Sequence, residues 1–149
     1  MDLSEILDDR IICIDMPSEN KDEAITFLSE KLKDAGYIDD VQSFKKDIYY
    51  RESVGITGIG NYIAIPHGKS DSVKNVGVAI GKLRHEIKWE TLDGKGVKVV
   101  FLFAVGKGKK SDNTHLMLLS QVASKLGDDS KVVQLLKART VEDIKKVFV

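Results

Sequence analysis

Apolar positions follow two spacings along the chain, and the two spacings alternate from one end to the other. Intervals of three and four residues predict one helix between Asn20 and Gly36, and a second that follows Asp40 and ends near Arg51. Apolar runs, some of them alternating with polar residues, predict strands over 11–14, 62–65, 76–83 and 97–105. The last run is almost wholly apolar, so we expect it at the centre of a sheet, covered on both faces.

The C-terminal part of the chain is predicted to be helical. A polar, lysine-rich loop over 106–112 comes first, and a shorter helix around 132–136 and a last one capped by Thr140 end the chain. Between them, the apolar face of a longer helix is marked by Leu116, Leu119, Val122 and Leu126. Because helix and strand signals alternate, we expect an α/β fold with a single mixed sheet, helices on both of its faces, and one domain over 1–149.

The net charge and its distribution along the chain limit the kinds of partner that the protein can bind. Among 149 residues, 23 lysines and arginines balance 23 acidic residues, which argues against a nucleic-acid binder driven by overall charge. The distribution is uneven, because 1–40 holds twelve acidic and four basic residues whereas 65–110 holds ten basic and four acidic ones. The basic segment either forms solvated faces or makes a rim near His67 that attracts an acidic or phosphorylated partner.

The cysteine content and the start of the chain bear on its compartment. Cys13 is the only cysteine, which excludes an internal disulfide and a cysteine-rich zinc site. The first residues are acidic, unlike a secretory signal, and no apolar run approaches the roughly 20 residues that cross a bilayer. We therefore expect a cytoplasmic protein.

His67 has the most informative setting of the three histidines. It follows a predicted strand that ends in proline, and a glycine-rich segment, 55–60, precedes it. Glycines let backbone N–H groups approach an anion closely, and the guanidinium of Arg51 suits the oxygens of a phosphate. The histidines lack the short spacings of a metal site, so we expect no metal. The pattern predicts a histidine beside an oxyanion cradle, to which we assign Thr57, Gly58 and Gly60.

The residues alone leave several interpretations open. His67 is a general base, a nucleophile that takes a phosphoryl group on a ring nitrogen, or a core-edge histidine bonded to a backbone carbonyl. His115 opens a predicted helix, where the helix dipole disfavours its cation. It serves the site as a neutral imidazole or is simply a polar surface residue. His85 is expected in a solvated turn, and Trp89 is expected to pack onto the sheet.

The segment 51–69 reads RESVGITGIGNYIAIPHGK. It resembles the signature of the fructose/mannitol-type enzyme IIA domain of the phosphoenolpyruvate-dependent sugar phosphotransferase system. Two positions depart from that pattern: Tyr62 stands where a small residue, often glycine, is usual, and Ile56 stands where serine is common. The similarity extends over nearly the whole chain and includes the segment 32–37, Trp89 with Asp93 and Gly94, the strand 99–104, and His115 with Leu116.

The resemblance implies a phosphoryl relay. His67 would accept a phosphoryl group from the phosphocarrier protein HPr and pass it to a cysteine on the IIB domain or subunit of a sugar permease. Arg51 would neutralise the phosphoryl oxygens, and His115 would be the second histidine of the active site. Such a transfer depends on positioning and charge stabilisation, so no cofactor is expected. Contact with the membrane would come only through the IIC component, which selects the sugar.

Two other functions stay in view beside sugar uptake, which we expect to be the main one. A regulatory binding module of the same fold, similar to the nitrogen-related IIA proteins, would use its phosphorylation state to control partner proteins. A hydrolase with His67 as the base is disfavoured, because no serine or cysteine nucleophile lies beside it in the sequence.

Overall fold

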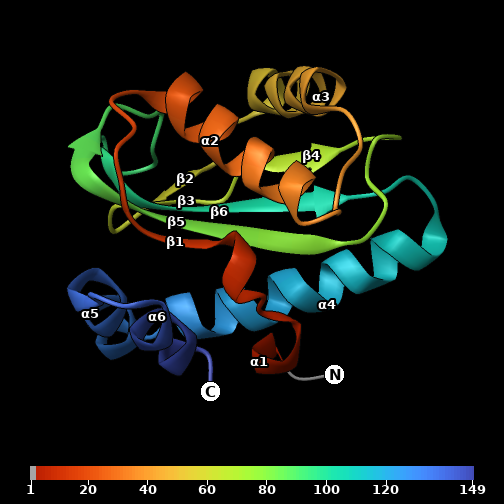
Figure 1. Ribbon diagram of the computed structural model, residues 1–149. Helices are drawn as coiled ribbons and strands as arrows, with labels where there is room; N and C mark the ends of the chain where they lie inside the picture. Colours follow the sequence, from red (N-terminus) through yellow and green to blue (C-terminus); the bar gives the residue numbers. More distant parts are fainter. Residues whose placement is uncertain (1–2) are drawn as a thin grey trace.

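The computed structural model describes residues 3–149 and shows one sheet between two layers of helices (Figure 1). Two helices, α2 and α3, cover one face of the sheet, and α1, α4, α5 and α6 lie on the other. The helices are α1 (Leu3–Ile6), the 3-10 turn η1 (Asp9–Ile11), α2 (Lys21–Asp34), α3 (Val41–Val54), α4 (Lys109–Leu126), α5 (Asp129–Lys137) and α6 (Val141–Val147). The strands are β1 (Ile12–Met16), β2 (Gly58–Gly60), β3 (Ile63–Ala64), β4 (His67–Lys69), β5 (Gly77–Ile87) and β6 (Val97–Val105).

The sheet is mixed, as the sequence predicts. Its main order is β1-β5-β6-β3-β2, in which β1 runs parallel to β5 and β5 runs antiparallel to β6. The short strands β3 and β4 follow one another along the same side of β6, both parallel to it. The first pairs with the N-terminal half of β6 and the second with its C-terminal end.

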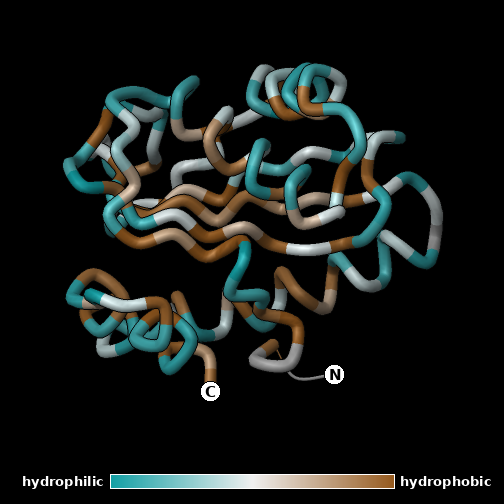
Figure 2. The backbone as a smooth tube through the Cα atoms, in the orientation of Figure 1, coloured by the Kyte–Doolittle hydropathy of each residue, from teal (hydrophilic) through white to brown (hydrophobic). Residues whose placement is uncertain are grey.

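The predicted central strand, β6, is buried on both faces. Side chains of a strand alternate between the two faces of its sheet, so β6 contributes to both cores. Val99, Phe101, Phe103 and Val105 pack toward α4–α6, and Val100, Leu102 and Ala104 pack toward α2 and α3. Figure 2 shows the apolar strands enclosed by helices with polar outer surfaces. The expectation of a strand covered on both faces is therefore confirmed.

The helix boundaries follow their capping residues. The Asn20 side chain accepts a hydrogen bond from the Glu23 backbone N–H at the start of α2. Thr140 and Asp143 form a reciprocal capping box at the start of α6, which satisfies backbone N–H groups that the helix itself cannot pair. Both starts agree with the sequence prediction.

Several features of the structure differ from the sequence prediction. The loop predicted over 106–112 is shorter, because α4 already begins at Lys109. His85 lies within the long strand β5 rather than in a turn, although its side chain is exposed as expected. The sequence did not predict β4, since proline and glycine flank His67 and weaken any strand signal there. Within residues 3–149, no helix combines the length and the apolar character needed to cross a membrane.

Helix α3 packs closely on β4 at Gly68. A Cβ atom built at Gly68 would lie 2.3 Å from Cε1 of Phe44, a buried side chain of α3. That distance is far below van der Waals contact, so only glycine allows α3 and β4 to approach this closely. The contact sets the spacing between the element that carries Arg51 and the strand that carries His67.

Candidate functional site

His67 is the first residue of β4, the short strand that pairs with the C-terminal end of β6. The Phe103 N–H donates to the Pro66 carbonyl at 2.9 Å, and His67 lies opposite Phe103 in the ladder. The two rings stack with centroids 4.9 Å apart and an interplanar angle of 24°. The backbone and the ring contact together fix the imidazole on the face of the sheet that α4 covers.

His115 approaches His67 from α4. The ring centroids are 4.8 Å apart with an interplanar angle of 76°, an edge-to-face arrangement. His115 also lies 5.6 Å from the Phe103 ring. Because α4 begins at Lys109, His115 sits in the second turn and does not open the helix as predicted. The fold nevertheless brings together the two histidines that the sequence placed far apart.

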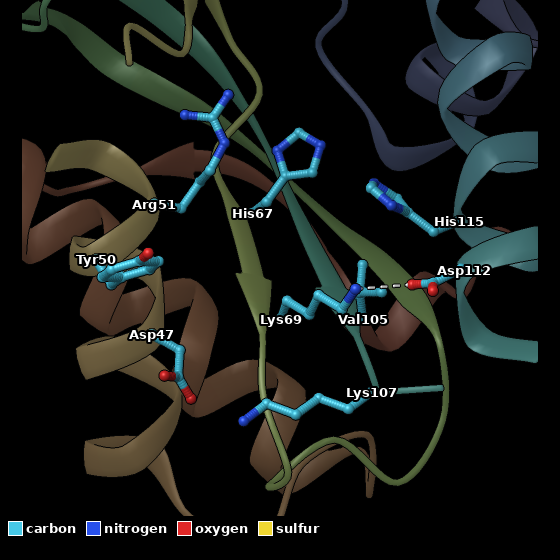
Figure 3. Close-up of a pocket in the computed structure, with 9 residues that line it drawn as sticks. All are labelled: Asp47, Tyr50, Arg51, His67, Lys69, Val105, Lys107, Asp112 and His115. Atoms are coloured by element: carbon cyan, nitrogen blue, oxygen red, sulfur yellow. Dashed lines mark ion pairs between the residues drawn. The ribbon is translucent and has the colours of Figure 1, made fainter. Parts of the chain in front are cut away.

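A cavity of about 450 Å³ opens at this point (Figure 3). In Figure 3, His67 lies between Arg51, which comes from α3, and His115, which comes from α4. All three predicted catalytic side chains therefore line one cavity. Its lining residues are Asp47, Tyr50, Arg51, His67, Lys69, Val105, Lys107, Asp112 and His115.

The surroundings of His67 keep its imidazole neutral. Burial is the main cause that lowers its pKa to about 4, and the neighbouring His115 and Arg51 lower it further. Burial likewise lowers the pKa of His115, although Asp112 acts in the opposite direction. Hydrogen bonding to the Ile65 backbone acts in the opposite direction and raises the pKa of His67. Nδ1 of His67 and Nε2 of His115 are both buried. At neutral pH, a neutral His67 keeps a lone pair available for a bond to an electrophile.

Arg51 lies in the last turn of α3 and supplies a permanent positive charge to the cavity. Its Nη1 donates to the Gly55 carbonyl at 3.2 Å. In the part of the chain that the structure describes, the guanidinium forms no ion pair with a carboxylate. Its remaining N–H groups can therefore bind an anion, and a planar fork of donors matches the oxygens of a phosphoryl group.

The three residues expected as phosphate donors lie outside the lining of the cavity. Thr57 is 2% exposed; its hydroxyl donates to the Glu52 carboxylate at 2.9 Å and accepts from Nε1 of Trp89 at 3.1 Å. Gly58 packs against Thr91, and a Cβ atom there would lie 2.4 Å from the Thr91 side chain. The Thr57 hydroxyl thus connects the end of α3 to the segment after β5. A direct phosphate contact by this hydroxyl would require breaking a buried hydrogen bond.

Gly60 is the last residue of β2 and leads into the turn to β3. Its φ of 92° lies in the left-handed region that favours glycine. Tyr62 follows in the same turn with a φ of 66°, which explains why a glycine suits this position. The Tyr62 ring lies under Lys98, with Nζ 4.3 Å from its centroid, and does not line the cavity. Ile56 is 51% exposed and does not line it either, so neither departure from the family pattern intrudes on His67.

Several lining residues escaped the sequence analysis, and two of them had a readable signal. Lys69 lies two positions after His67, the spacing that puts two side chains on one face of a strand. Asp112 lies three positions before His115, the spacing of neighbours on one face of a helix. No metal site was expected, and within residues 3–149 no three His, Cys, Asp or Glu side chains group in a way that could hold a metal ion.

Comparison with protein families and known sequences gives a consistent result. The family model described as "Phosphoenolpyruvate-dependent sugar phosphotransferase system, EIIA 2" matches residues 5–149. The fructose-specific EIIABC component of Bacillus subtilis is 36% identical over 144 residues, which cover 97% of this chain. The chain spans only 22% of that relative's own length. The fructose-specific EIIA component of Haloferax volcanii is 32% identical over 146 residues, which cover 96% of this chain and 94% of the relative.

Solved structures show the same fold. A nitrogen regulatory protein IIA-Ntr from Neisseria meningitidis superposes with a TM-score of 0.86 at 26% identity, covering 99% of both chains. The mannitol IIA protein of Escherichia coli, in a complex with its phosphorylated IIB protein, superposes with a TM-score of 0.77. It is 22% identical and covers 95% of this chain and 96% of that one. The family match over almost the full chain and the sequence relatives confirm the resemblance: this chain belongs to the EIIA type 2 family of the phosphoenolpyruvate-dependent sugar phosphotransferase system.

Proposed function

We propose that this chain is a phosphocarrier that receives a phosphoryl group from phospho-HPr on His67 and passes it to a cysteine of a IIB domain or subunit. The observation that carries the proposal is a neutral, half-buried imidazole in a cavity shared with Arg51 and His115. A nucleophile, a cation for the phosphoryl oxygens and a second imidazole are the parts that such a transfer needs. The phosphotransferase family assignment supports the same reaction class.

Nε2 is the nitrogen that accepts the phosphoryl group in this proposal, because Nδ1 is buried. The Nε2 lone pair forms the new N–P bond while the N–P bond of the donor breaks, and that electron pair returns to the donor imidazole. In the next transfer, a thiolate of the IIB protein attacks the phosphorus and the N–P electron pair returns to Nε2. Arg51 binds the phosphoryl oxygens in both steps, where its charge stabilises the transition state.

The surface near the cavity offers apolar side chains for docking of the two protein partners. Tyr50, which lines the cavity, is 72% exposed, and Leu116, next to His115, is 63% exposed. Exposed aromatic and aliphatic residues beside an active site are typical of interfaces that form and separate repeatedly.

Sugar uptake is the function we favour, since the two relatives above are named as fructose-specific components. The chain would then reach the membrane only through a IIC component, and IIC would select the sugar. The regulatory alternative is favoured by one observation, the close structural likeness to a nitrogen regulatory IIA protein. Transfer of the phosphoryl group onward to a sugar, in the presence of a IIB and IIC permease, distinguishes the two functions.

The decisive experiment is intact-mass spectrometry after incubation with enzyme I, HPr and phosphoenolpyruvate. The pH must stay neutral to alkaline, because a phosphohistidine is labile in acid. We expect a gain of one phosphoryl group in the wild-type chain and none in the His67→Ala variant. An unmodified wild-type chain, beside a control IIA protein that is modified in the same mixture, would refute the phosphocarrier function.

A further inference from the structure

The cavity is lined by a second side chain from β4, that of Lys69, on the same face of the strand as His67. Lys69 and His67 lie at the two ends of the three-residue strand β4, on the same face of the sheet, about 6.6 Å apart along the backbone. Both side chains line the same cavity. The flexible four-carbon stem of Lys69 can therefore bring its ammonium group to an anion bound on His67.

Lys69 is at present paired with a carboxylate of α4. Its Nζ lies 3.0 Å from Oδ1 of Asp112, as the dashed line in Figure 3 marks. Asp112 lies one helical turn before His115 and also lines the cavity. The ion pair therefore spans the cavity from β4 to α4, between the strand that carries one histidine and the helix that carries the other.

Of the three cationic side chains that line the cavity, Lys107 contacts Asp71, and the other two, Arg51 and Lys69, have different partners. Arg51 donates to a neutral carbonyl, whereas Lys69 is bound to a charged group. The Lys69–Asp112 pair is half exposed, with 55% and 45% of the two side chains accessible to solvent. Exposed pairs of this kind contribute little net stability and exchange partners readily. A phosphoryl group carries about two negative charges, against one for a carboxylate, and competes well for the ammonium group.

We propose that Lys69 is a second phosphoryl-binding cation, and that Asp112 holds it away from His67 until the phosphoryl group arrives. The inference rests on the proposed function, because it specifies how the same site stabilises its phosphorylated state. Lys69 moves from Asp112 to the phosphoryl oxygens, which Arg51 also binds. The Asp112 carboxylate is then left unpaired. Because Asp112 competes with the phosphoryl group for Lys69, it sets how strongly the protein retains the phosphoryl group.

The test uses the equilibrium distribution of the phosphoryl group between HPr and the full chain, measured by intact mass. Lys69→Ala removes the second cation, and we expect a shift of about tenfold toward phospho-HPr. Asp112→Asn removes the competitor, and we expect a shift in the opposite direction. Lys69→Arg should restore most of the wild-type distribution, and the double variant should behave like Lys69→Ala.

The chain offers a matched control in Lys74, whose Nζ lies 3.1 Å from Asp39. That pair is similarly exposed, at 60% and 52%, and lies outside the cavity lining. Lys74→Ala changes the net charge as Lys69→Ala does, and it should leave the distribution unchanged. A purely structural ion pair would make Lys69→Ala and Asp112→Asn shift the distribution in the same direction or not at all, and either result would overturn the proposal.

A measurement on the wild-type chain keeps the test independent of the variants' folding. The ¹⁵N signal of the Lys69 ammonium group should change on phosphorylation, while that of Lys74 should not. An unchanged Lys69 signal in a chain whose mass shows full phosphorylation would refute the role of Lys69. Failure of the phosphocarrier function itself would be recognised separately, because the wild-type chain would then gain no phosphoryl group.

Discussion

The imidazole of His67 meets that of His115 edge to face, with 4.8 Å between the ring centroids, although β4 supplies one and α4 the other. The contact joins the strand that carries the proposed nucleophile to the helix that covers this face of the sheet. A neutral His115 beside the reacting ring can form a hydrogen bond with a phosphoryl oxygen as charge shifts during transfer.

We expect His115→Ala to bind HPr as the wild type does but to accept the phosphoryl group about 10- to 100-fold more slowly, the range for losing a hydrogen bond to a charged group. Affinity is measured by titration calorimetry with unphosphorylated HPr, and the rate by rapid-quench mixing with phospho-HPr. Transfer at the wild-type rate would remove His115 from the mechanism.

Arg51→Ala should slow phosphoryl acceptance by on the order of a hundredfold, because the phosphoryl oxygens lose their unpaired cation in a partly buried site. Arg51→Lys should recover only part of that loss, since an ammonium group lacks the planar fork of donors. Single-turnover rates give the comparison, and circular dichroism checks that both variants are folded. Equal rates for the wild type and Arg51→Ala would contradict the role of the guanidinium.

The lowered pKa of His67 makes the stability of the fold depend on pH. The unfolded chain binds a proton at this residue below about pH 6.5, whereas the folded chain does so only near its pKa of about 4. The free energy of unfolding is therefore highest above pH 6.5 and falls as the pH is lowered toward 4, by at most about 3 kcal/mol from this residue.

Urea unfolding of the wild type and of His67→Asn between pH 7.5 and pH 4 measures this dependence. The variant lacks the titrating group, so its stability should fall less steeply as the solution is acidified. The contribution of His115, whose pKa is also lowered, is common to both proteins. Parallel stability curves for the two proteins would show that His67 titrates in the folded chain as it does in the unfolded chain.

Thr57→Val should destabilise the fold by about 1–3 kcal/mol, because it leaves the buried Trp89 N–H without an acceptor and removes one donor to the Glu52 carboxylate, which keeps Lys21. Phosphoryl acceptance by the folded fraction should fall far less than in Arg51→Ala. Thr57→Ser retains the hydroxyl and serves as the control. If Thr57→Val instead abolished transfer without loss of stability, the hydroxyl would be a direct phosphate donor, as the sequence pattern first indicated.

Sequence reasoning predicted those elements of the fold that have a strong periodic signal. The strand 97–105 and the helix after Asn20 are observed with almost the predicted bounds, because burial on defined faces imposes their patterns. The start of α4 could not be predicted, since Gly108 supplies no side-chain cap and the first turn is rich in lysine. A polar helix start without a capping residue cannot be distinguished from a loop in the sequence.

The sequence indicated three of the residues that line the cavity but not how they are arranged. Arg51 and His67 stand in a distinctive motif, and His115 was identified through the family resemblance. The Thr57 hydroxyl, assigned to phosphate, bonds to Glu52 and Trp89 instead. Nothing local in the sequence shows that a threonine in a glycine-rich segment faces an indole brought from elsewhere in the chain. Such long-range contacts become visible only in three dimensions.

The close contact between Gly68 and Phe44 gives a steric reason for the glycine in the motif around His67. A glycine next to a histidine that is proposed to accept a phosphoryl group could be attributed to phosphate binding. Gly68, however, lies where α3 packs closely on β4. The position is therefore under a steric constraint that would persist even in a relative that had lost phosphoryl transfer. Under the proposed function, a glycine at this position would mark the fold, whereas Arg51 and His67 together would mark the reaction, so the two kinds of position can be compared separately among relatives.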